Sequence, residues 1–405
     1  MSFLRNGPIA AALLGAAWMV TLAITVAVAV AFVTGEALRP SVVWSLLLGA
    51  VLGAGLLYMR LPMAVAVAVS VALGAVLMVV GIGPILAGED AGFTAQALAV
   101  FFLWAGFAIA VLKTNEGLAP GDADRYTFET SCIRFLTGFG YIFFTAIVAI
   151  PFWVMLMTSF KSRAEQVANP LDFGIDFSKG RELFRSYEEL FTQFDFGLYL
   201  ANSFLISVIT VLVTLLFAIP GAYAVARLRF SGQAAFSRGI LLIYMVPMIV
   251  LALPIYIAFS VTGLRNSIFG ILLIYPVTTS PGALYMLQGY FRGLPAEVEE
   301  AGLMDGLSRL KVIWKITLPL SLPALASVSL YVFMIAWNEF LLAFMLLDDP
   351  SKFTLTRGIA ALNSSEIPRQ HLMAGSVIAT VPIMALFLGL ERFMTKGLTA
   401  GSVKG

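Results

Sequence analysis

The stretch EEAGLMDGLSRLKVIWKITLP, from Glu299 to Pro319, is a charged, glycine-containing interruption in an apolar chain. The apolar stretches on either side are each long enough to cross a bilayer, which takes about 20 residues. Charged side chains are costly inside hydrocarbon, so this stretch is expected to lie in water at a membrane surface. We therefore expect the rest of the chain to form membrane helices on either side of it.

Residues 295–319 are predicted to form two short helices joined by a turn. Pro295 has the φ angle of a first helical turn, and Glu299 is one of several acidic residues that the positive end of a helix dipole favours. Gly306 can adopt the left-handed conformation common after a helix. Ser308 is expected to cap a second helix. The apolar face of that second helix consists of Leu310, Ile313, Trp314 and Leu318.

Two residues of the first helix have almost no side chain. Ala301 and Gly302 would let this helix approach another surface very closely. The 295–319 segment is therefore predicted to be a docking site. The alternative is an amphipathic loop at the membrane interface that has no partner.

The composition indicates a membrane protein. Of the 405 residues, 60% are hydrophobic and only 12% are charged, whereas about a quarter of the residues in a soluble domain are charged. Cys132 and His371 are the single cysteine and the single histidine, so neither an internal disulfide nor a metal site is expected. The net charge of +2 and the absence of a basic tract give no indication of nucleic-acid binding.

The predicted fold class is an all-α polytopic membrane protein with about ten transmembrane helices. The run after Arg5 is longer than the apolar core of a signal peptide, which has about 7–15 residues, so it is read as a retained helix. The ten apolar segments are 8–32, 41–58, 62–87, 95–112, 135–157, 203–226, 239–261, 268–288, 320–347 and 372–392.

The polar stretch KTNEGLAPGDADRYTFETSCIR, residues 113–134, is the best domain boundary. It predicts an N-terminal four-helix membrane region at 1–112, a cytoplasmic linker at 113–134 and a six-helix domain at 135–405. The four N-terminal helices contain almost no ionisable residues, which argues against an ion relay there. The sequence GAVLG at 49–53 has the spacing of close helix contacts but carries little weight in a glycine-rich chain.

The distribution of basic residues predicts the orientation in the membrane. Short cytoplasmic loops carry an excess of lysine and arginine, and most of these residues face the cytoplasm if the N-terminus does. Both termini and the 295–319 segment are then cytoplasmic. The short outer loops contain only Arg39, Arg265, Lys352, Arg357 and Arg369.

The 295–319 segment resembles the EAA loop of permease subunits of binding-protein-dependent ABC importers. Gly302 departs from the pattern, because alanine is usual there, and glycine loosens a helix by about 1 kcal/mol relative to alanine. The matching residues, at the family's spacing, are Glu300, Ala301, Gly302, Gly306, Ile316, Leu318 and Pro319.

The resemblance extends over about the last two thirds of the chain. The stretches YLANSFLISV (199–208), GAYAVARLRF (221–230), LPIYIAFSVTGLRNSIFGILLIY (253–275) and GLTAGSVKG (397–405) are similar to the carbohydrate-uptake branch. They are most similar to the G-type subunit of maltose permeases. The resemblance implies that residues 135–405 form a type I ABC-importer permease core in a prokaryotic cytoplasmic membrane.

The implied function is to pass a sugar or oligosaccharide, similar to maltose or an α-glucoside, from a solute-binding protein into the cytoplasm. The implied partners are two cytoplasmic ATPase subunits and a second permease that is not identical to this one. No G-x-x-x-x-G-K-[ST] motif occurs in the chain, so ATP and Mg²⁺ are expected on the ATPase subunits, with no cofactor and no enzyme activity here. The alternatives are a polyol or polyamine permease and, from another class, an ion-coupled secondary transporter. Ion-coupled transporters usually have buried ionisable residues and internal symmetry. In this sequence buried charges are sparse and no internal repeat is visible.

The resemblance also assigns candidate residues at the cytoplasmic face. The coupling loop 295–319 would insert into a cleft of the ATPase, and the C-terminal stretch would reach the interface of the ATPase dimer. The alternative for the C-terminus is a disordered tail. The coupling residues are Glu300, Ala301, Gly302, Asp305, Gly306, Ile316, Leu318 and Pro319, and the C-terminal contacts are Gly397, Gly401 and Lys404.

Two further groups are candidates for the solute path and the outer face. Trp337, Asn338 and Glu339 could line the outer cavity, because an acid within a membrane helix needs a cavity or a partner. The alternative is that Glu339 merely pairs near the outer interface. In the maltose system the sugar contacts come from the partner permease. The candidate binding-protein contacts, for which an ordinary polar turn is the alternative, are Asn363, Ser364, Ser365 and Glu366.

Overall fold

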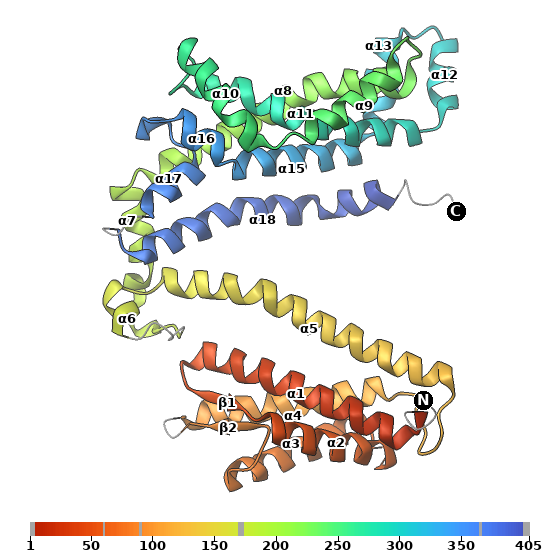
Figure 1. Cartoon of the computed structure of the whole chain (residues 1–405), viewed down its shortest axis with the longest axis vertical. Helices are drawn as coiled ribbons and strands as arrows, with labels where there is room; N and C mark the ends of the chain where they lie inside the picture. The colour runs from red at the N-terminus through yellow and green to blue at the C-terminus, as the bar shows by residue number, and fades with distance from the viewer. Residues whose placement is uncertain (1–4, 60, 89–90, 169–173, 364–366, 400–405) are drawn as a thin grey trace. The chain divides into compact units, whose positions relative to one another are not determined.

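The computed structural model describes residues 5–59, 61–88, 91–168, 174–363 and 367–399. It divides into two compact units, Met1–Leu183 and Phe184–Gly405. Most of the described chain is helical (Figure 1). The prediction of an all-α polytopic membrane protein is confirmed.

The first unit is a cluster of long helices with one short hairpin. Helix α1 packs against α2 and α4, α3 packs against α4, and α5 contacts both α1 and α4. Strands β1 and β2 pair antiparallel, with Leu38 opposite Ala87. The elements are α1 (Gly7–Thr34), β1 (Leu38–Pro40), α2 (Val42–Met59), α3 (Met63–Val80), β2 (Ile85–Ala87), α4 (Phe93–Thr114), α5 (Arg125–Ser159) and α6 (Arg163–Ala168), followed by a 3₁₀ helix (Phe177–Phe184) that ends at the unit boundary.

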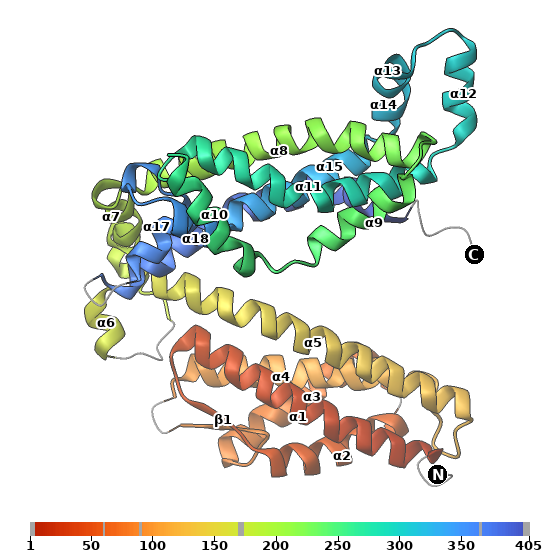
Figure 2. The same ribbon diagram turned by 45° about the horizontal axis from the view of Figure 1, so that its top comes forward.

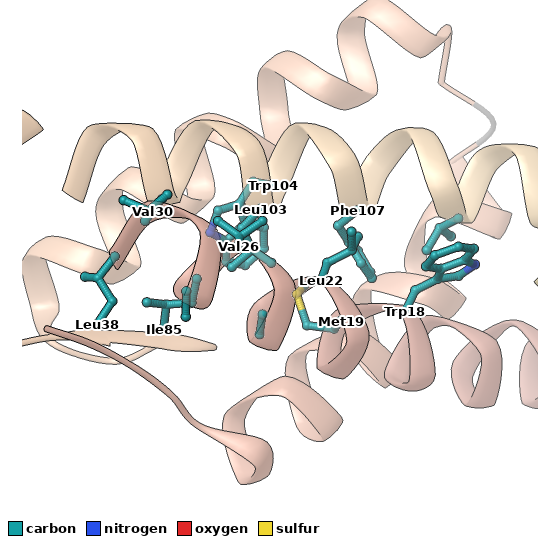
Figure 3. Packing of buried hydrophobic residues seen from close by; sticks show 14 of the residues in the cluster. Trp18, Met19, Leu22, Val26, Val30, Leu38, Ile85, Leu103, Trp104 and Phe107 are labelled. Atoms are coloured by element: carbon teal, nitrogen blue, oxygen red, sulfur yellow. The ribbon is translucent and has the colours of Figure 1, made fainter. Parts of the chain in front are cut away.

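The core of the first unit lies between α1 and α4. Leu22 and Val26 of α1 belong to one buried cluster with Leu103 and Phe107 of α4 (Figure 3). At one end of this cluster, the Trp18 indole N–H donates to the Thr114 hydroxyl over 2.9 Å. In lipid the driving force for such packing is van der Waals contact and interhelical hydrogen bonding, and this interface supplies both.

Glycines bring the backbones of α1 and α2 into contact. A Cβ added at Gly49 would lie 2.6 Å from the Gly15 carbonyl oxygen and 2.8 Å from Ala16 Cα. Gly53, four residues on, faces Ala11 and Gly15. The small-residue spacing at 49–53, which carried little weight in the sequence, therefore marks the crossing of these two helices.

Replacing Gly49 by isoleucine is expected to destabilise the first unit by 1–3 kcal/mol or more, because the obstructing atoms belong to the α1 backbone and cannot rotate away. The matched control is Gly55→Ile on the same helix, where an added Cβ meets no atom within 4 Å. The measurement is thermal unfolding of the full chain in detergent. Equal midpoints for the two variants would contradict the close crossing.

The predicted count of ten spans is not reproduced. Within the residues that the structure describes, eight helices are long and apolar enough to span a membrane, or nine if one bent pair counts as a single span. The segment 239–261 divides into α9 (Gln233–Tyr244) and α10 (Met248–Val261), with Pro247 at the N-cap of α10. Proline lacks a donor N–H and disfavours the helical conformation of the residue before it, so it interrupts a helix. Average hydropathy does not detect this interruption.

The helix ends also differ from the expected linker. Helix α4 continues to Thr114, and α5 begins at Arg125, where the Asp124 side chain accepts a hydrogen bond from the Thr127 N–H. The stretch between these helices is therefore only 115–124, shorter than the predicted linker at 113–134. The contacts also place α5 in the first unit, whereas the sequence grouped residues 135–157 with the six-helix domain.

The second unit is a bundle in which α8 packs against α11 and α15, and α15 packs against α18 (Figures 1 and 2). A small helical hairpin lies at one end of the bundle, and short helices gather at the other. The remaining elements are α7 (Arg185–Gln193), α8 (Phe196–Arg227), α11 (Ile268–Gly293), α12 (Ala296–Met304), α13 (Arg309–Val312), a π-helix (Ile313–Thr317), α14 (Leu318–Leu320), α15 (Leu322–Asn338), α16 (Leu341–Leu346), a 3₁₀ turn (Pro350–Lys352), α17 (Leu355–Leu362) and α18 (Arg369–Thr399).

Candidate coupling site at one end of the bundle

The 295–319 segment forms a helical hairpin, as its sequence predicts. Helix α12 leads through a turn into α13, the π-helix and α14. The second arm, Arg309–Leu320, is bent by 81° from α15, Leu322–Asn338. The hairpin therefore lies across the end of the bundle and does not continue its helices (Figure 2).

The turn of the hairpin depends on Gly306. Its φ angle is 83°, in the left-handed region. The Gly306 N–H donates to the Leu303 carbonyl and the Leu307 N–H donates to the Gly302 carbonyl, each over 3.1 Å. This pair of bonds is a Schellman motif, which satisfies carbonyls at the end of α12. Ser308 occupies the N-cap position of α13, but its side chain makes no capping hydrogen bond.

Gly302 faces the inside of the hairpin and not the docking surface expected from the sequence. It is buried, and a Cβ added there would lie 2.5 Å from Ile316 Cδ1 and 3.6 Å from Val312 Cγ2. The absent side chain thus allows α12 to pack against the second arm. Ile316, also predicted at this site, is part of that internal contact.

The exposed residues at the C-terminal end of α12 are others. Glu300, Ala301, Met304 and Asp305 are all exposed, and Met304 has 88% of its surface accessible. We call these four residues the α12 face. Glu299 and Gly302 are three residues apart and lie on the opposite, buried side of the helix. Leu318 is half-buried and Pro319 is exposed where the second arm meets α15.

A buried carboxylate fixes α12 to the bundle. Glu299 is only 7% exposed. Its Oε2 accepts a hydrogen bond from the Tyr223 hydroxyl over 3.2 Å, and its Oε1 accepts one from the Thr317 hydroxyl over 3.0 Å. Arg227 Nε lies 3.5 Å from the same Oε1. Arg227 also donates from its terminal nitrogen to the Leu294 carbonyl over 2.7 Å.

These contacts connect three elements through Glu299. Tyr223 and Arg227 belong to the end of α8, and Thr317 belongs to the π-helix. A π-helix turn is wider than an α-helix turn and is frequent at functional sites. Movement of α12 would therefore be transmitted to α8 through one side chain. The sequence interpretation assigned Glu299 only a helix-dipole role. In the sequence, the one indication that Glu299 is buried is its three-residue spacing from Gly302. This spacing places both residues on the same side of the helix, away from Glu300.

Replacing Gly306 by valine is expected to destabilise the hairpin turn. The left-handed conformation costs about 1–2 kcal/mol for a residue with a side chain, and β-branching adds to that cost. Crowding plays no part, because an added Cβ meets nothing within 4 Å. Protease cleavage of the hairpin measures the effect. Gly289→Val, at a helical position that is equally open, is the control, and equal cleavage of both variants contradicts the prediction.

At the other end of the bundle, the predicted solute-path residues do not converge. Trp337 is buried, donates from Nε1 to the Ala379 carbonyl over 3.0 Å, and stacks on Phe333. Asn338 is exposed, and its amide donates to the Met334 carbonyl of its own helix. Trp337 is thus part of the core in this conformation.

Glu339 lies at a break between α15 and α16. Its Oε1 accepts from the Leu342 N–H over 2.7 Å, and its Oε2 accepts from the Ala343 N–H over 3.1 Å and from the Tyr275 hydroxyl over 2.6 Å. Its carbonyl accepts from the Thr356 hydroxyl. Glu339 therefore caps α16 and connects α11, α15 and α17. Of the two sequence interpretations, this geometry matches the one in which Glu339 is paired.

A buried histidine also lies at this end of the bundle. His371 is 4% exposed, and its Nε2 is 2.6 Å from Glu189 Oε2. Hydrogen bonding from Arg185, with a smaller contribution from His371, holds the pKa of the Glu189 carboxyl below its usual range. Within the described ranges, no group of three or more histidine, cysteine or acidic residues is placed to hold a metal ion.

Some predicted contacts fall outside the described part of the chain. Asn363 is exposed at the C-cap of α17, but Ser364, Ser365 and Glu366 lie outside the described residues. The backbone of α18 includes Gly397. The remaining C-terminal residues, Gly401 and Lys404, also lie outside the described residues.

Comparison with known proteins places this architecture in a family. Residues 218–399, which contain the hairpin and Glu299, match the family described as binding-protein-dependent transport system inner membrane component. The Escherichia coli inner membrane ABC transporter permease protein YcjP is 37% identical over 270 residues, which are 66% of this chain and 95% of that protein.

Two other relatives have similar coverage. The trehalose/maltose transport system permease protein MalG of Thermococcus litoralis is 33% identical over 67% of this chain and 97% of its own length. The diacetylchitobiose uptake system permease protein DasC of Streptomyces coelicolor is 30% identical over 65% and 94%, respectively.

A solved structure has the same fold. It is a bacterial ABC transporter involved in the import of the acidic polysaccharide alginate, with a TM-score of 0.56 and 24% sequence identity. The similarity covers 67% of this chain and 98% of the other. The relatives are transport components and not enzymes. With nearly the full length of YcjP matched, the chain belongs to the inner membrane components of binding-protein-dependent transport systems, the permease subunits of ABC importers.

Proposed function

We propose that this chain passes a sugar or oligosaccharide across the cytoplasmic membrane, and that the 295–319 hairpin couples this transport to ATP hydrolysis on separate subunits. Family membership implies an ATPase and a solute-binding protein as partners. The observation that carries the coupling role is the arrangement of α12, in which an exposed face lies opposite a buried carboxylate fixed to α8.

The proposed mechanism follows from these contacts. The ATPase binds the α12 face, formed by Glu300, Ala301, Met304 and Asp305. When the ATPase closes on ATP, it displaces α12, and Glu299 transmits the displacement to α8 through Tyr223 and Arg227. The second arm transmits it to α15 across the 81° bend. The bundle thereby alternates between an inward-open state, which faces the cytoplasm, and an outward-open state, which faces the solute-binding protein.

The proposed assembly has two cytoplasmic ATPase subunits, a second, non-identical permease and a solute-binding protein on the outer face. ATP and Mg²⁺ bind to the ATPase subunits. Both termini of this chain are cytoplasmic, and the C-terminal stretch with Gly397, Gly401 and Lys404 contacts the ATPase. The outer loop at 363–366 contacts the binding protein. The four N-terminal helices, α1 to α4, serve as a structural or partner-binding addition.

The proposed solute class is a sugar or oligosaccharide similar to maltose or an α-glucoside. It is supported by the names of the relatives, which include permeases for trehalose and maltose, diacetylchitobiose and arabinooligosaccharides. A binding assay on the cognate solute-binding protein, with sugars, polyols and polyamines compared side by side, tests this class. Binding of a polyamine alone would exclude the carbohydrate assignment.

The coupling role is tested by purifying the chain together with its ATPase and measuring solute uptake in proteoliposomes. We expect a stable complex whose uptake stops when ATP hydrolysis is blocked by a mutation in the ATPase. A paired substitution on the α12 face, Ala301→Trp with Met304→Asp, is expected to release the ATPase. Uptake that continues without ATP hydrolysis would instead identify an ion-coupled transporter.

A further inference from the structure

The second arm of the hairpin has large apolar side chains on its surface. Leu310 and Trp314 are each 71% exposed. They are four residues apart and therefore lie on one side of the helix. Val312 is buried and Ile316 packs against Gly302, so the opposite side of this arm contacts α12. The side with Leu310 and Trp314 therefore faces away from α12.

The orientation of the arm shows where this side points. The arm is bent by 81° from α15, so it runs nearly parallel to the membrane plane if α15 crosses the membrane. Both views place α12 farther out along the long axis of the bundle than α13 (Figures 1 and 2). The side of α13 opposite α12 therefore faces back along the bundle, toward the level of the bilayer.

The charges of the hairpin are separated between its two arms. Arg309, Lys311 and Lys315 are exposed on the second arm, and this arm contains no acidic residue. The exposed acidic residues of the hairpin belong to α12 and to the turn after it. Tryptophan is enriched at membrane interfaces, and long lysine side chains extend toward lipid headgroups while their stems lie on apolar surface.

We propose that Leu310 and Trp314 insert into the cytoplasmic leaflet, with Lys311 and Lys315 bound to anionic headgroups. We call these four residues the membrane face. An amphipathic helix lying in the interface binds through apolar burial together with attraction to anionic lipid. The hairpin then has two binding surfaces: the α12 face binds the ATPase, and the membrane face binds lipid. The membrane face fixes the position of the hairpin relative to the bilayer surface. It thereby holds the second arm, against which α12 packs, in place when the ATPase displaces α12.

The proposal requires only that α15 spans the membrane, and it does not depend on the identity of the solute. The test uses spin labels on the full chain with Cys132→Ser, in bilayers of phosphatidylethanolamine and phosphatidylglycerol. Labels are attached at Leu310→Cys and Trp314→Cys. Met304→Cys, an exposed position on the α12 face, is the matched control. Collision rates with oxygen, which concentrates in lipid, and with a water-soluble nickel complex are compared for each label.

We expect the labels at 310 and 314 to collide severalfold more with oxygen than with nickel, and the label at 304 to show the reverse. Nickel collision at 310 and 314 equal to that at 304 would overturn the proposal. So would shielding of 310 and 314 from both reagents only after the ATPase is added, because the covering partner would then be protein. Failure of the ATPase to shield 304 would count against the proposed coupling role and not against the membrane face.

The lysines are tested separately with Lys311→Gln and Lys315→Gln combined. We expect this variant to need several times more phosphatidylglycerol than the parent to reach the same oxygen preference at 314. Lys352→Gln, in the 3₁₀ turn at the other end of the bundle, removes a lysine charge far from the hairpin; it is the control and is expected to change nothing. An oxygen preference that is the same in pure phosphatidylcholine as in phosphatidylglycerol would overturn the role assigned to the lysines.

Discussion

Glu299→Leu is expected to abolish ATP-driven uptake while the chain still reaches the membrane. The substitution leaves Arg227, whose side chain is only 14% exposed, without its carboxylate and removes the acceptor for Tyr223 and Thr317. Breaking a buried ion pair by removing one partner costs about 3–5 kcal/mol. We therefore expect α12 to detach from α8 and the transmission of movement to fail.

The measurement pairs uptake with ATPase activity in the purified complex. ATP hydrolysis is expected to continue at a rate that no longer responds to solute and binding protein, because the ATPase still binds the α12 face. Glu299→Gln retains an oxygen acceptor for one of the two hydroxyls and is expected to restore part of the uptake. Glu297→Leu, an exposed acidic residue on the same helix, is the control. Normal solute-stimulated hydrolysis in Glu299→Leu would contradict the role of this carboxylate.

Glu339→Ala is expected to produce the largest effect at the other end of the bundle. The side chain accepts three hydrogen bonds, two from the N–H groups that begin α16 and one from Tyr275. A hydrogen bond to a charged group contributes about 1.5–3 kcal/mol. Because the three bonds act on one side chain and are not additive, we expect a loss of about 3 kcal/mol in the free energy of unfolding.

Thermal unfolding and solute uptake together separate the two interpretations of Glu339. If the Glu339 side chain caps α16 and connects that helix to α11, the alanine variant unfolds at a lower temperature and Glu339→Gln recovers part of the stability. Asn338→Ala, which removes only a bond within its own helix, is expected to change stability by less than about 0.5 kcal/mol. An alanine variant of unchanged stability but weakened solute affinity would instead place Glu339 on the solute path.

The separation of roles between Glu299 and Glu300 explains how one short helix can both bind a partner and remain attached to the bundle. The two residues are neighbours in sequence, but a helix turns by about 100° per residue, since 3.6 residues complete one turn. Glu299 consequently lies against α8 and the π-helix, while Glu300 is exposed. Gly302 belongs with Glu299, since its lack of a side chain lets the second arm approach.

The sequence by itself determined the features that depend on local composition and period. Apolar length predicted most of the membrane helices, and Gly306 predicted the left-handed turn that ends α12. The spacing of the 295–319 segment identified the family before its geometry was known. These inferences succeed because hydropathy, helix termination and glycine conformation are set by residues close together in the chain.

Only the tertiary structure decided which residues face inward and what each one contacts. Glu299 meets Tyr223 and Arg227 from a helix more than 70 residues earlier, and the close crossing at Gly49 requires Gly15 of another helix. In a chain this apolar, hydrophobic periodicity is weak, because lipid and protein interior favour the same side chains. The burial of a glycine or a carboxylate therefore depends on long-range packing, which no single segment of the sequence encodes.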